Sequence, residues 1–302
     1  MSLLQVTELE KSFGATKAVK RISFQLEEGR CTTLLGPNGA GKTTTLRMLA
    51  GLLEPTAGRI ALSGAEQAEL RSLIGYLPQY PSFYPWMTGK EFLVFAGQLS
   101  HMKHKEAMSR ADDMLAAVGL AEAGRRRIGG YSGGMKQRLG LAQAMMHRPR
   151  LIILDEPVSA LDPIGRREVL DMMKALKEQT TILFSTHVLP DAEEITDDLL
   201  IMNQGEIIIA GTLRDVMEEH RQPVIRLRGE SSLVMWEEAL GKLPGIEQAT
   251  CEGDQAELIV SDREVGRASL VRFIADQAIA IRKLEVAELS LEDLFMKAVK
   301  AE

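Results

Sequence analysis

Residues 36–43 read Gly-Pro-Asn-Gly-Ala-Gly-Lys-Thr, and this stretch decides the fold of the chain around it. Its glycines let backbone N–H groups face phosphate oxygens, and the N-terminus of a following helix adds favourable partial charge. Lys42 has the length to reach the β- and γ-phosphates of a nucleotide, and the Thr43 hydroxyl is a ligand for Mg²⁺. The predicted phosphate-binding residues are Gly36, Pro37, Asn38, Gly39, Ala40, Gly41, Lys42, Thr43 and Thr44.

The residues on either side of this loop supply the structural context that it needs. Residues 32–35 form a short apolar run that predicts a strand, and residues 42–52 have helical character. Strand, glycine-rich loop and helix in this order favour a true phosphate loop over the alternative, a chance glycine-rich turn. The loop alone does not separate an ATPase from a kinase or a GTPase.

A second apolar run, residues 151–155, ends in an acid and is followed directly by Glu156. Such a run is typical of a central parallel strand that is buried on both faces. Because ligands of open α/β sheets bind at the carboxyl ends of the strands, we expect Asp155 to hold Mg²⁺ through water. Glu156 is the candidate general base that polarises an attacking water. Without Lys42, a solvated Asp-Glu pair in a loop would be the better interpretation.

The composition is that of an ordinary globular protein long enough for two domains. The chain has 302 residues, 45% of them hydrophobic, and its formal net charge of −6 gives no reason to expect nucleic acid as a partner. Cys31 and Cys251 lack a metal-ligand spacing and indicate a reducing compartment. The N-terminus carries Glu8 and Glu10 and does not resemble a signal peptide. We expect no membrane-spanning segment, so any membrane role requires another polypeptide.

The rest of the pattern predicts a larger α/β domain followed by a smaller α+β domain. The larger one spans 1–220, with residues 90–148 largely helical, and the smaller one spans 223–302 after a compositional shift at 221–223. In the smaller domain the predicted order βαββαβ is a ferredoxin-like pattern. The elements expected there are strand 224–229, helix 232–243, strands 246–251 and 256–261, helix 265–278, strand 280–287 and a last helix through 291–296.

Residues 1 to about 220 resemble an ATP-binding cassette (ABC) nucleotide-binding subunit, because further motifs follow the phosphate loop in the family's order. Residues 132–137, Ser-Gly-Gly-Met-Lys-Gln, resemble the LSGGQ element, with Tyr131 in place of Leu and Met-Lys inserted before the Gln. The resemblance implies a P-loop NTPase fold with a RecA-like core, an antiparallel β subdomain and a helical subdomain. It also implies that two cassettes close over two ATP molecules, each element binding the γ-phosphate held by the other protomer.

The resemblance gives roles to single residues that would mean little alone. Gln79 resembles the glutamine that senses Mg²⁺ and the attacking water, and His187 resembles the switch histidine at the γ-phosphate. Asp162 lies in residues 159–162, which resemble the D-loop at the dimer interface. Phe13 matches the aromatic residue that stacks on adenine, with a core phenylalanine as the alternative. The resemblance implies that the catalytic residues are Glu156, His187, Lys42 and Gln79. It implies that the metal-site residues are Thr43, Gln79 and Asp155. Ser132, Gly133 and Gly134 are expected to bind nucleotide, and Ser132 is also expected to cap its helix.

Two segments bear on what such a subunit moves. Residues 81–91 are rich in aromatics and resemble the LYPxMTxxE segment of exporter-type subunits, which lines the groove for a helix of the membrane subunit; internal packing is the alternative. Residues 289–295 resemble the SLEDxF ending of subunits paired with ABC-2-type export permeases. We therefore expect a cytoplasmic homodimer on the inner face of the cell membrane, bound to a separate permease. The alternatives are an ABC ATPase acting on ribosomes or DNA, and an importer subunit; the transported substrate is not readable.

Overall fold

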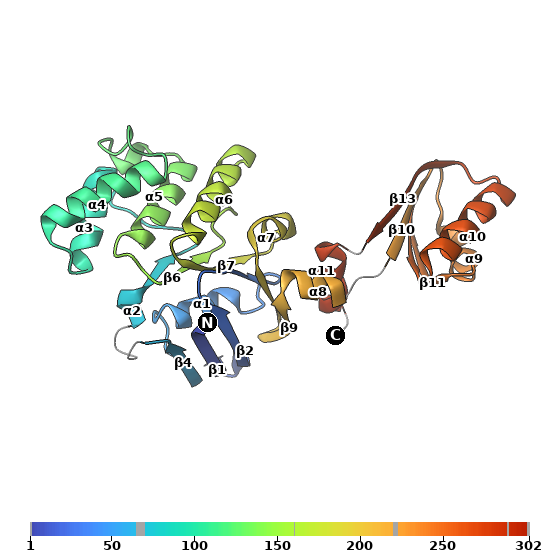
Figure 1. The fold of residues 1–302 in the computed structure, drawn as a ribbon, viewed down its shortest axis with the longest axis horizontal. Coiled ribbons are helices and arrows are strands. Elements are labelled where there is room, and N and C mark those ends of the chain that lie inside the picture. Colours follow the sequence, from blue (N-terminus) through green and yellow to red (C-terminus); the bar gives the residue numbers. More distant parts are fainter. Residues whose placement is uncertain (1, 65–69, 160, 220–222, 289, 301–302) are drawn as a thin grey trace. The chain divides into compact units, whose positions relative to one another are not determined.

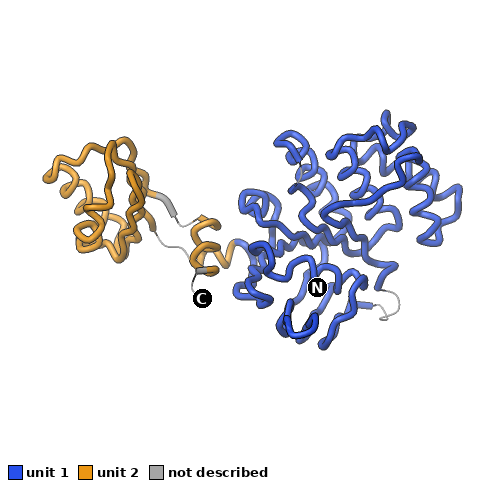
Figure 2. The backbone as a smooth tube through the Cα atoms, turned by 180° about the vertical axis from the view of Figure 1, so that it is seen from behind, with its two compact units in different colours: residues 1–213 blue, residues 214–302 orange. Residues whose placement is uncertain are grey.

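The computed structural model of the chain describes residues 2–64, 70–159, 161–219, 223–288 and 290–300. The chain divides into two compact units, which are residues 1–213 (unit 1) and residues 214–302 (unit 2), coloured separately in Figure 2. Positions 160, 220–222 and 289, which belong to segments or a boundary predicted from the sequence, lie outside the described residues.

A mixed sheet forms the centre of unit 1 (Figure 1). Its strands, in spatial order, are β5 (Ile74–Leu77), β6 (Leu151–Asp155), β7 (Thr181–Thr186), β3 (Cys31–Leu35), β8 (Asp198–Asn203) and β9 (Glu206–Thr212). Neighbours are parallel except β8 and β9, which form an antiparallel hairpin. Strands β3, β6 and β7 are buried throughout, as predicted for central strands, and their carboxyl ends meet at one edge.

A second sheet and a set of helices complete unit 1. The second sheet is antiparallel, in the order β2 (Thr16–Glu27), β1 (Ser2–Phe13) and β4 (Ala57–Leu62). The helices are α1 (Lys42–Leu49), α2 (Leu70–Leu73), α3 (Gly89–Leu99), α4 (His104–Ala117), a 3₁₀ turn (Ile128–Gly130), α5 (Gly133–Met145), α6 (Pro163–Lys177) and α7 (Leu189–Ile195). This arrangement confirms the predicted α/β fold class. Within the described ranges, no helix combines the length and the apolar character that crossing a bilayer requires.

The two faces of the central sheet are buried in different apolar clusters. Ile152 and Leu154 of β6 pack with the side chains of α3, α4, α5 and α6. Leu151 and Ile153 point the other way, into a cluster shared with α1 and the antiparallel sheet. Successive strand residues face opposite sides, so the continuous apolar run of β6 follows from having two cores to fill. Asp155 ends this run between them.

The helix after the glycine-rich loop is shorter than predicted, because α1 ends at Leu49 whereas helical character was expected to residue 52. Gly51 has a φ of 66°, and the Leu52 N–H donates to the Arg47 carbonyl at 2.9 Å. A glycine in this left-handed conformation, with a hydrogen bond reaching back across the last turn, is a common way for a helix to end.

Unit 2 has the predicted ferredoxin-like order. It contains α8 (Leu213–Glu219), β10 (Pro223–Gly229), a 3₁₀ turn (Val234–Trp236), α9 (Glu237–Gly241), β11 (Ile246–Glu252), β12 (Gln255–Val260), α10 (Arg263–Asp276), β13 (Ile281–Glu288) and α11 (Leu291–Lys300). The strands form an antiparallel sheet in the order β11-β12-β10-β13. The helix expected over 232–243 is instead the 3₁₀ turn followed by the short α9.

Apolar side chains from the strands and from α10 form the core of unit 2. Ile225, Leu227, Leu258, Val260 and Leu270 belong to one cluster, with Phe273, Ile274 and Ile281 packed against it. Val224 is also buried but lies outside this cluster. Because it neighbours Ile225 along a strand, its side chain faces the opposite side of the sheet.

The last helix is attached to the sheet of unit 2 through the residues of the SLED-like motif. The Ser290 hydroxyl accepts from the Asp293 N–H at 3.2 Å, and the Ser290 N–H donates to the Asp293 carboxylate at 2.8 Å. This reciprocal pair caps the N-terminus of α11. The Arg226 guanidinium on β10 donates to the same carboxylate. The motif therefore has a structural role here: it starts α11 and ties it to β10.

Both cysteines are free and buried. Burial raises the pKa of the Cys31 thiol to about 12, and burial likewise raises the pKa of Cys251. The two thiols sit in different units, Cys31 at the start of β3 and Cys251 in β11.

Candidate active site

The glycine-rich loop lies between β3 and α1 and passes closely under neighbouring backbone. A Cβ atom on Gly36 would stand 2.3 Å from the Met202 carbonyl oxygen, so no larger residue fits there. Gly41 caps α1 with a φ of 103°, and a Cβ atom there would meet the Ala18 carbonyl oxygen at 2.5 Å. Space requires both glycines, and the left-handed backbone conformation also requires the one at Gly41. Asn38 and Gly39 are exposed, which leaves the crest of the loop open to a ligand.

Lys42 is buried beneath this loop. Its Nζ donates to the carbonyl oxygens of Gly36 at 2.7 Å and Pro37 at 3.1 Å, and lies 3.8 Å from Oε1 of Glu156. Burial lowers the pKa of Lys42, while the Glu156 and Asp155 carboxylates oppose that shift. The loop carbonyls hold the ammonium group in place before any phosphate arrives.

Asp155 and Thr43 form an oxygen-rich pair at the edge of the sheet. The Thr43 hydroxyl donates to Oδ1 of Asp155 at 3.1 Å, across from the end of β6 to the first turn of α1. Asp155 is buried and also accepts from the Ser185 hydroxyl at 2.8 Å. A carboxylate and a hydroxyl beside a phosphate loop suit Mg²⁺, which prefers oxygen ligands and keeps several waters. The residues present therefore fit the predicted metal.

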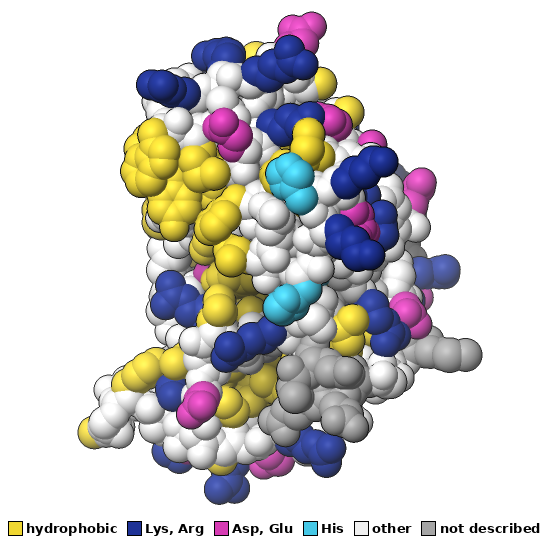
Figure 3. Space-filling model, turned by 90° about the vertical axis from the view of Figure 1, so that its left-hand side faces the viewer, with side chains coloured by type: hydrophobic (Ala, Val, Ile, Leu, Met, Phe, Trp, Pro, Cys, Tyr) yellow, Lys and Arg dark blue, Asp and Glu magenta, His cyan; other side chains and the backbone are white. Residues whose placement is uncertain are grey.

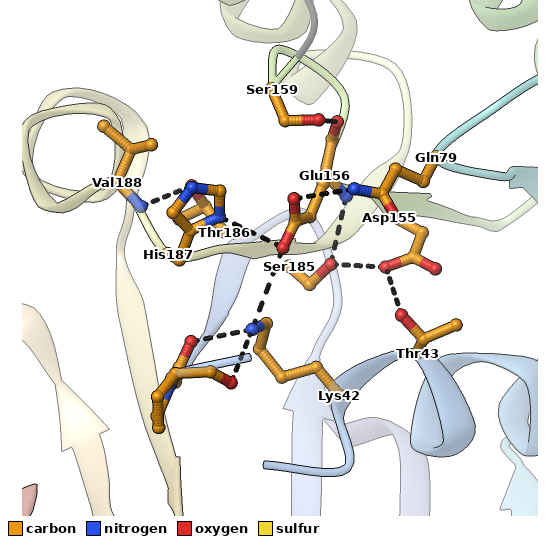
Figure 4. A network of polar contacts seen from close by, with 12 residues as sticks. Lys42, Thr43, Gln79, Asp155, Glu156, Ser159, Ser185, Thr186, His187 and Val188 are labelled. Atoms are coloured by element: carbon orange, nitrogen blue, oxygen red, sulfur yellow. Dashed lines mark hydrogen bonds and ion pairs between the residues drawn. The ribbon is translucent and has the colours of Figure 1, made fainter. Parts of the chain in front are cut away.

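Glu156 is the centre of the polar network in Figure 4. Gln79 Nε2 donates to its Oε2 at 3.0 Å, and Nδ1 of His187 lies 3.1 Å from its Oε1. With Lys42 near the same Oε1, side chains from three separate segments converge on the Glu156 carboxylate. Glu156 has a φ of 46°, a strained conformation for a residue with a side chain. This turn of the backbone directs Glu156 away from Asp155, as the predicted difference in their roles requires.

Ser185 was not singled out in the sequence, yet it joins the two carboxylates. It pairs with Asp155 in the register of β6 and β7, and its Oγ accepts from the Glu156 N–H at 3.0 Å while donating to Asp155. Its signal in the sequence was its place at the end of an apolar strand, two residues before His187. A small hydroxyl there reads as an ordinary strand residue until the neighbouring strand is known.

Ser132, Gly133 and Gly134 lie elsewhere in unit 1, at the N-terminus of α5. The Ser132 hydroxyl accepts from the Met135 N–H at 3.3 Å, which confirms the predicted helix cap. Ser132 and Gly133 are exposed, and a Cβ atom on Gly133 would meet no atom within 4 Å. The apolar side chains of α5 pack in the cluster on one face of the central sheet and those of α1 in the cluster on the other face. The two phosphate-binding elements of this chain therefore belong to opposite sides of the sheet.

Asp162 and Phe13 are also placed by the structure. The Asp162 carboxylate accepts from the Gly165 N–H at 3.2 Å and caps α6. Phe13 is 52% exposed at the end of β1, with the Lys11 ammonium 5.2 Å from its ring centroid. The alternative of a core phenylalanine is therefore wrong, and the ring is accessible to a planar ligand.

Comparisons with known proteins agree with this geometry. The ABC transporter family model matches residues 19–159, and a model for the C-terminal domain of DrrA1-3-like ATP-binding proteins matches residues 211–299. An uncharacterized ABC transporter ATP-binding protein of Bacillus subtilis, YxlF, is 49% identical over 99% of this chain and 100% of its own length. The linearmycin resistance ATP-binding protein LnrL of the same organism is 34% identical over 97% of both chains.

A solved structure supports the fold of unit 1. An ATP-binding cassette in a dimeric post-hydrolysis state, bound to ADP and Pi, is 25% identical, covers 70% of this chain and 99% of its own, and superimposes with a TM-score of 0.63. The family hydrolyses ATP, and the extent of these similarities covers both units. The chain belongs to the family of ABC transporter ATP-binding proteins.

Proposed function

We propose that this ATPase subunit works as a homodimer that binds two Mg²⁺-ATP molecules and drives export through a separate membrane permease. The convergence of Lys42, Gln79 and His187 on Glu156 is the observation that carries the catalytic part. The separation of Ser132 from that group carries the dimeric part, because an exposed helix N-terminus with two free glycines is an anion site that its own chain does not use. The relative in the dimeric state supports the same assembly.

Each residue of the network has a distinct task in this proposal. Lys42 and the loop N–H groups bind the β- and γ-phosphates, and Phe13 stacks on adenine. Mg²⁺, when bound beside Thr43 and Asp155, neutralises charge on the phosphates. Glu156 accepts a proton from water attacking the γ-phosphorus, and Gln79 and His187 hold the carboxylate and the water in line. The second cassette contributes the N–H groups of Gly133 and Gly134 to the γ-phosphate.

An aromatic cluster on unit 1 supports the permease contact. The rings of Phe83 and Phe92 pack edge to face with their centroids 5.0 Å apart, and both pack in the apolar cluster of the helical part. For these two residues the alternative of internal packing therefore holds. Tyr84 and Trp86 lie 5.1 Å apart, and Trp86 is 65% exposed. Hydrophobic side chains, several of them rings, gather on this face in Figure 3. Exposed aromatics on a packed base suit a helix of a membrane subunit. Export is inferred from the resistance function named for the linearmycin relative and from the DrrA-like unit 2.

The catalytic part is tested with Glu156→Gln. The amide keeps the contact with Gln79 but cannot accept the proton, so we expect turnover to fall by about 10²–10⁴-fold while ATP binding persists. ATP-bound dimers should accumulate and appear in size-exclusion chromatography with ATP. Lys42→Ala is the contrasting variant, because it should weaken nucleotide binding itself. Turnover of Glu156→Gln within a factor of two of the wild type removes Glu156 from the role of base.

The permease contact is tested by co-expression with a membrane protein that co-purifies with the wild-type chain. Trp86→Ser should reduce co-purification of that protein without changing the ATPase activity of the isolated subunit. Met235→Ser is a matched control, because Met235 is an exposed hydrophobic residue of unit 2 outside the aromatic cluster. Equal recovery of the membrane protein with all three forms contradicts this docking surface.

A further inference from the structure

Helices α6 and α7 start beside the catalytic network. The loop that contains Asp162 leads into α6, and the loop that contains His187 leads into α7. Helix α6 begins directly after Asp162, whose carboxylate caps its first turn. Helix α7 begins two residues after His187, and its capping residue Val188 donates its N–H to the Thr186 hydroxyl at 2.9 Å. A shift of either helix therefore moves the attached loop. His187 depends on the position of α7, and Asp162 on that of α6.

A buried ion pair joins the first turns of these helices. Nε and Nη2 of Arg166 donate to Oδ1 of Asp191 at 2.6 Å and 2.5 Å. The Asp191 side chain is 2% exposed, and its Oδ2 has no hydrogen-bond partner among the residues that the structure describes. Burial raises the pKa of Asp191. The positive charge of Arg166 opposes this shift, and the charge of His187 also lowers the pKa. A buried carboxylate that is only partly satisfied is costly, so stability alone is a poor reason for it.

The same two helices are also joined on their exposed side, which makes a comparison possible. Glu194 of α7 accepts from Nη1 of Arg167 and from Nζ of Lys174, both at 2.6 Å. These pairs are solvent-accessible and lie on the later turn of α7. Exposed pairs of this kind contribute little to stability. They hold the helices together but do not reach the residues next to His187.

We propose that Arg166 and Asp191 form a positioning pair that couples the Asp162 loop to the switch residue His187. The inference rests on the proposed dimer, in which the partner cassette meets the Asp162 loop. Arg166 lies one turn into α6 and Asp191 four residues after His187, so the pair joins the two helices close to both loops. When the second cassette settles on the Asp162 loop, the link fixes α7 and keeps Nδ1 of His187 at Oε1 of Glu156. Neither residue touches the nucleotide.

The test compares Asp191→Asn, which keeps the size of the side chain and removes its charge, with Glu194→Gln as the control. Misplacing a catalytic group by about 1 Å can cost 10²-fold, so we expect kcat of Asp191→Asn to fall about 10- to 100-fold. The KM for ATP should stay within about twofold, because Lys42 and the loop are unchanged. Glu194→Gln should keep kcat within about twofold. Equal losses of kcat in both variants overturn the proposal.

A double-mutant cycle with His187→Ala separates positioning from simple stabilisation. If Asp191 acts through His187, the double variant should be no slower than His187→Ala alone, whereas independent effects multiply. A multiplied loss overturns the proposal. Arg166→Gln repeats the cycle if Asp191→Asn fails to fold, and Arg166→Lys should restore part of the rate. Full activity of His187→Ala would instead contradict the proposed catalytic role of His187, so the two failures are distinguishable.

Discussion

At the scale of the residue, one hydroxyl connects the metal site and the base. The Ser185 hydroxyl donates a hydrogen bond to the Asp155 carboxylate and accepts one from the Glu156 backbone N–H. The two carboxylates therefore share one support although they serve different steps. Mutation of groups that orient metal ligands typically lowers metal affinity or activity by about 10–100-fold.

We expect Ser185→Ala to raise the Mg²⁺ concentration needed for half-maximal ATPase activity by about 10-fold. The reason is that Asp155 then loses the hydroxyl that donates to it at 2.8 Å, while the Thr43 hydroxyl remains. A magnesium titration at saturating ATP measures the change. Ser159→Ala is the control, because the Ser159 hydroxyl donates to the Glu156 carbonyl, at 3.2 Å, and not to either carboxylate in the described part of the chain. An unchanged magnesium requirement contradicts this role for Ser185.

Residues within a motif could be anticipated from the sequence, whereas residues that act across strands could not. Asp155 and Glu156 can be identified from the sequence because an apolar run ends in two acidic residues. Ser185 and Asp191 have no such local mark, because their importance comes from the strand and the helix that pack beside them. The exposure of Phe13 was likewise undecided in the sequence, since a ring at the end of a strand can face either way.

At the scale of the element, strands were anticipated better than short helices. The run 151–155 matched β6 because burial on both faces leaves an unbroken apolar signal. The helix predicted over 232–243 was too long, because residues 234–236 form a 3₁₀ turn and α9 covers only Glu237–Gly241. Local composition favours helix there, but packing against β11 and α10 decides how much of it forms.

The isolation of the α5 N-terminus from α1 predicts complementation between inactive chains. Mixing Lys42→Ala with Ser132→Arg chains should restore part of the ATPase activity, because one of the two composite sites in the mixed dimer keeps both halves. Each variant alone should be inactive, since it lacks one half of both sites. Activity is measured against the ratio of the two chains. No recovery despite demonstrated mixed dimers contradicts two independently working sites in a homodimer.

At the scale of the whole molecule, the phosphate-site residues all belong to unit 1, and unit 2 has an apolar core of its own. A domain with its own core can act by raising the local concentration of the unit it carries. We propose that unit 2 holds two cassettes near each other between ATP cycles. The order of its strands could be predicted because turns punctuate the sequence. Its role could not, because the motif at residues 290–293 has a structural use in starting α11.

Removing residues 222–302, which hold the whole sheet of unit 2, should therefore change how activity depends on protein concentration. A fragment of residues 1–221 should still bind ATP but need a higher concentration to reach the same specific ATPase activity as the full chain. Sedimentation without nucleotide should find the full chain more associated than the fragment. Equal sedimentation together with equal concentration dependence contradicts the brace and favours a docking or regulatory role.

The two native cysteines are buried, so they should react little with thiol-directed spectroscopic labels. With a pKa of about 12, Cys31 is thiolate in roughly one molecule in 10⁴ at pH 8, and its burial blocks reagents as well. Cys251 is shielded in the same way. A single cysteine introduced at the exposed Ser132 would thus take a maleimide dye or a nitroxide almost alone. Pulsed electron resonance between two such labels would report the closing of the pair directly, without first removing either native thiol.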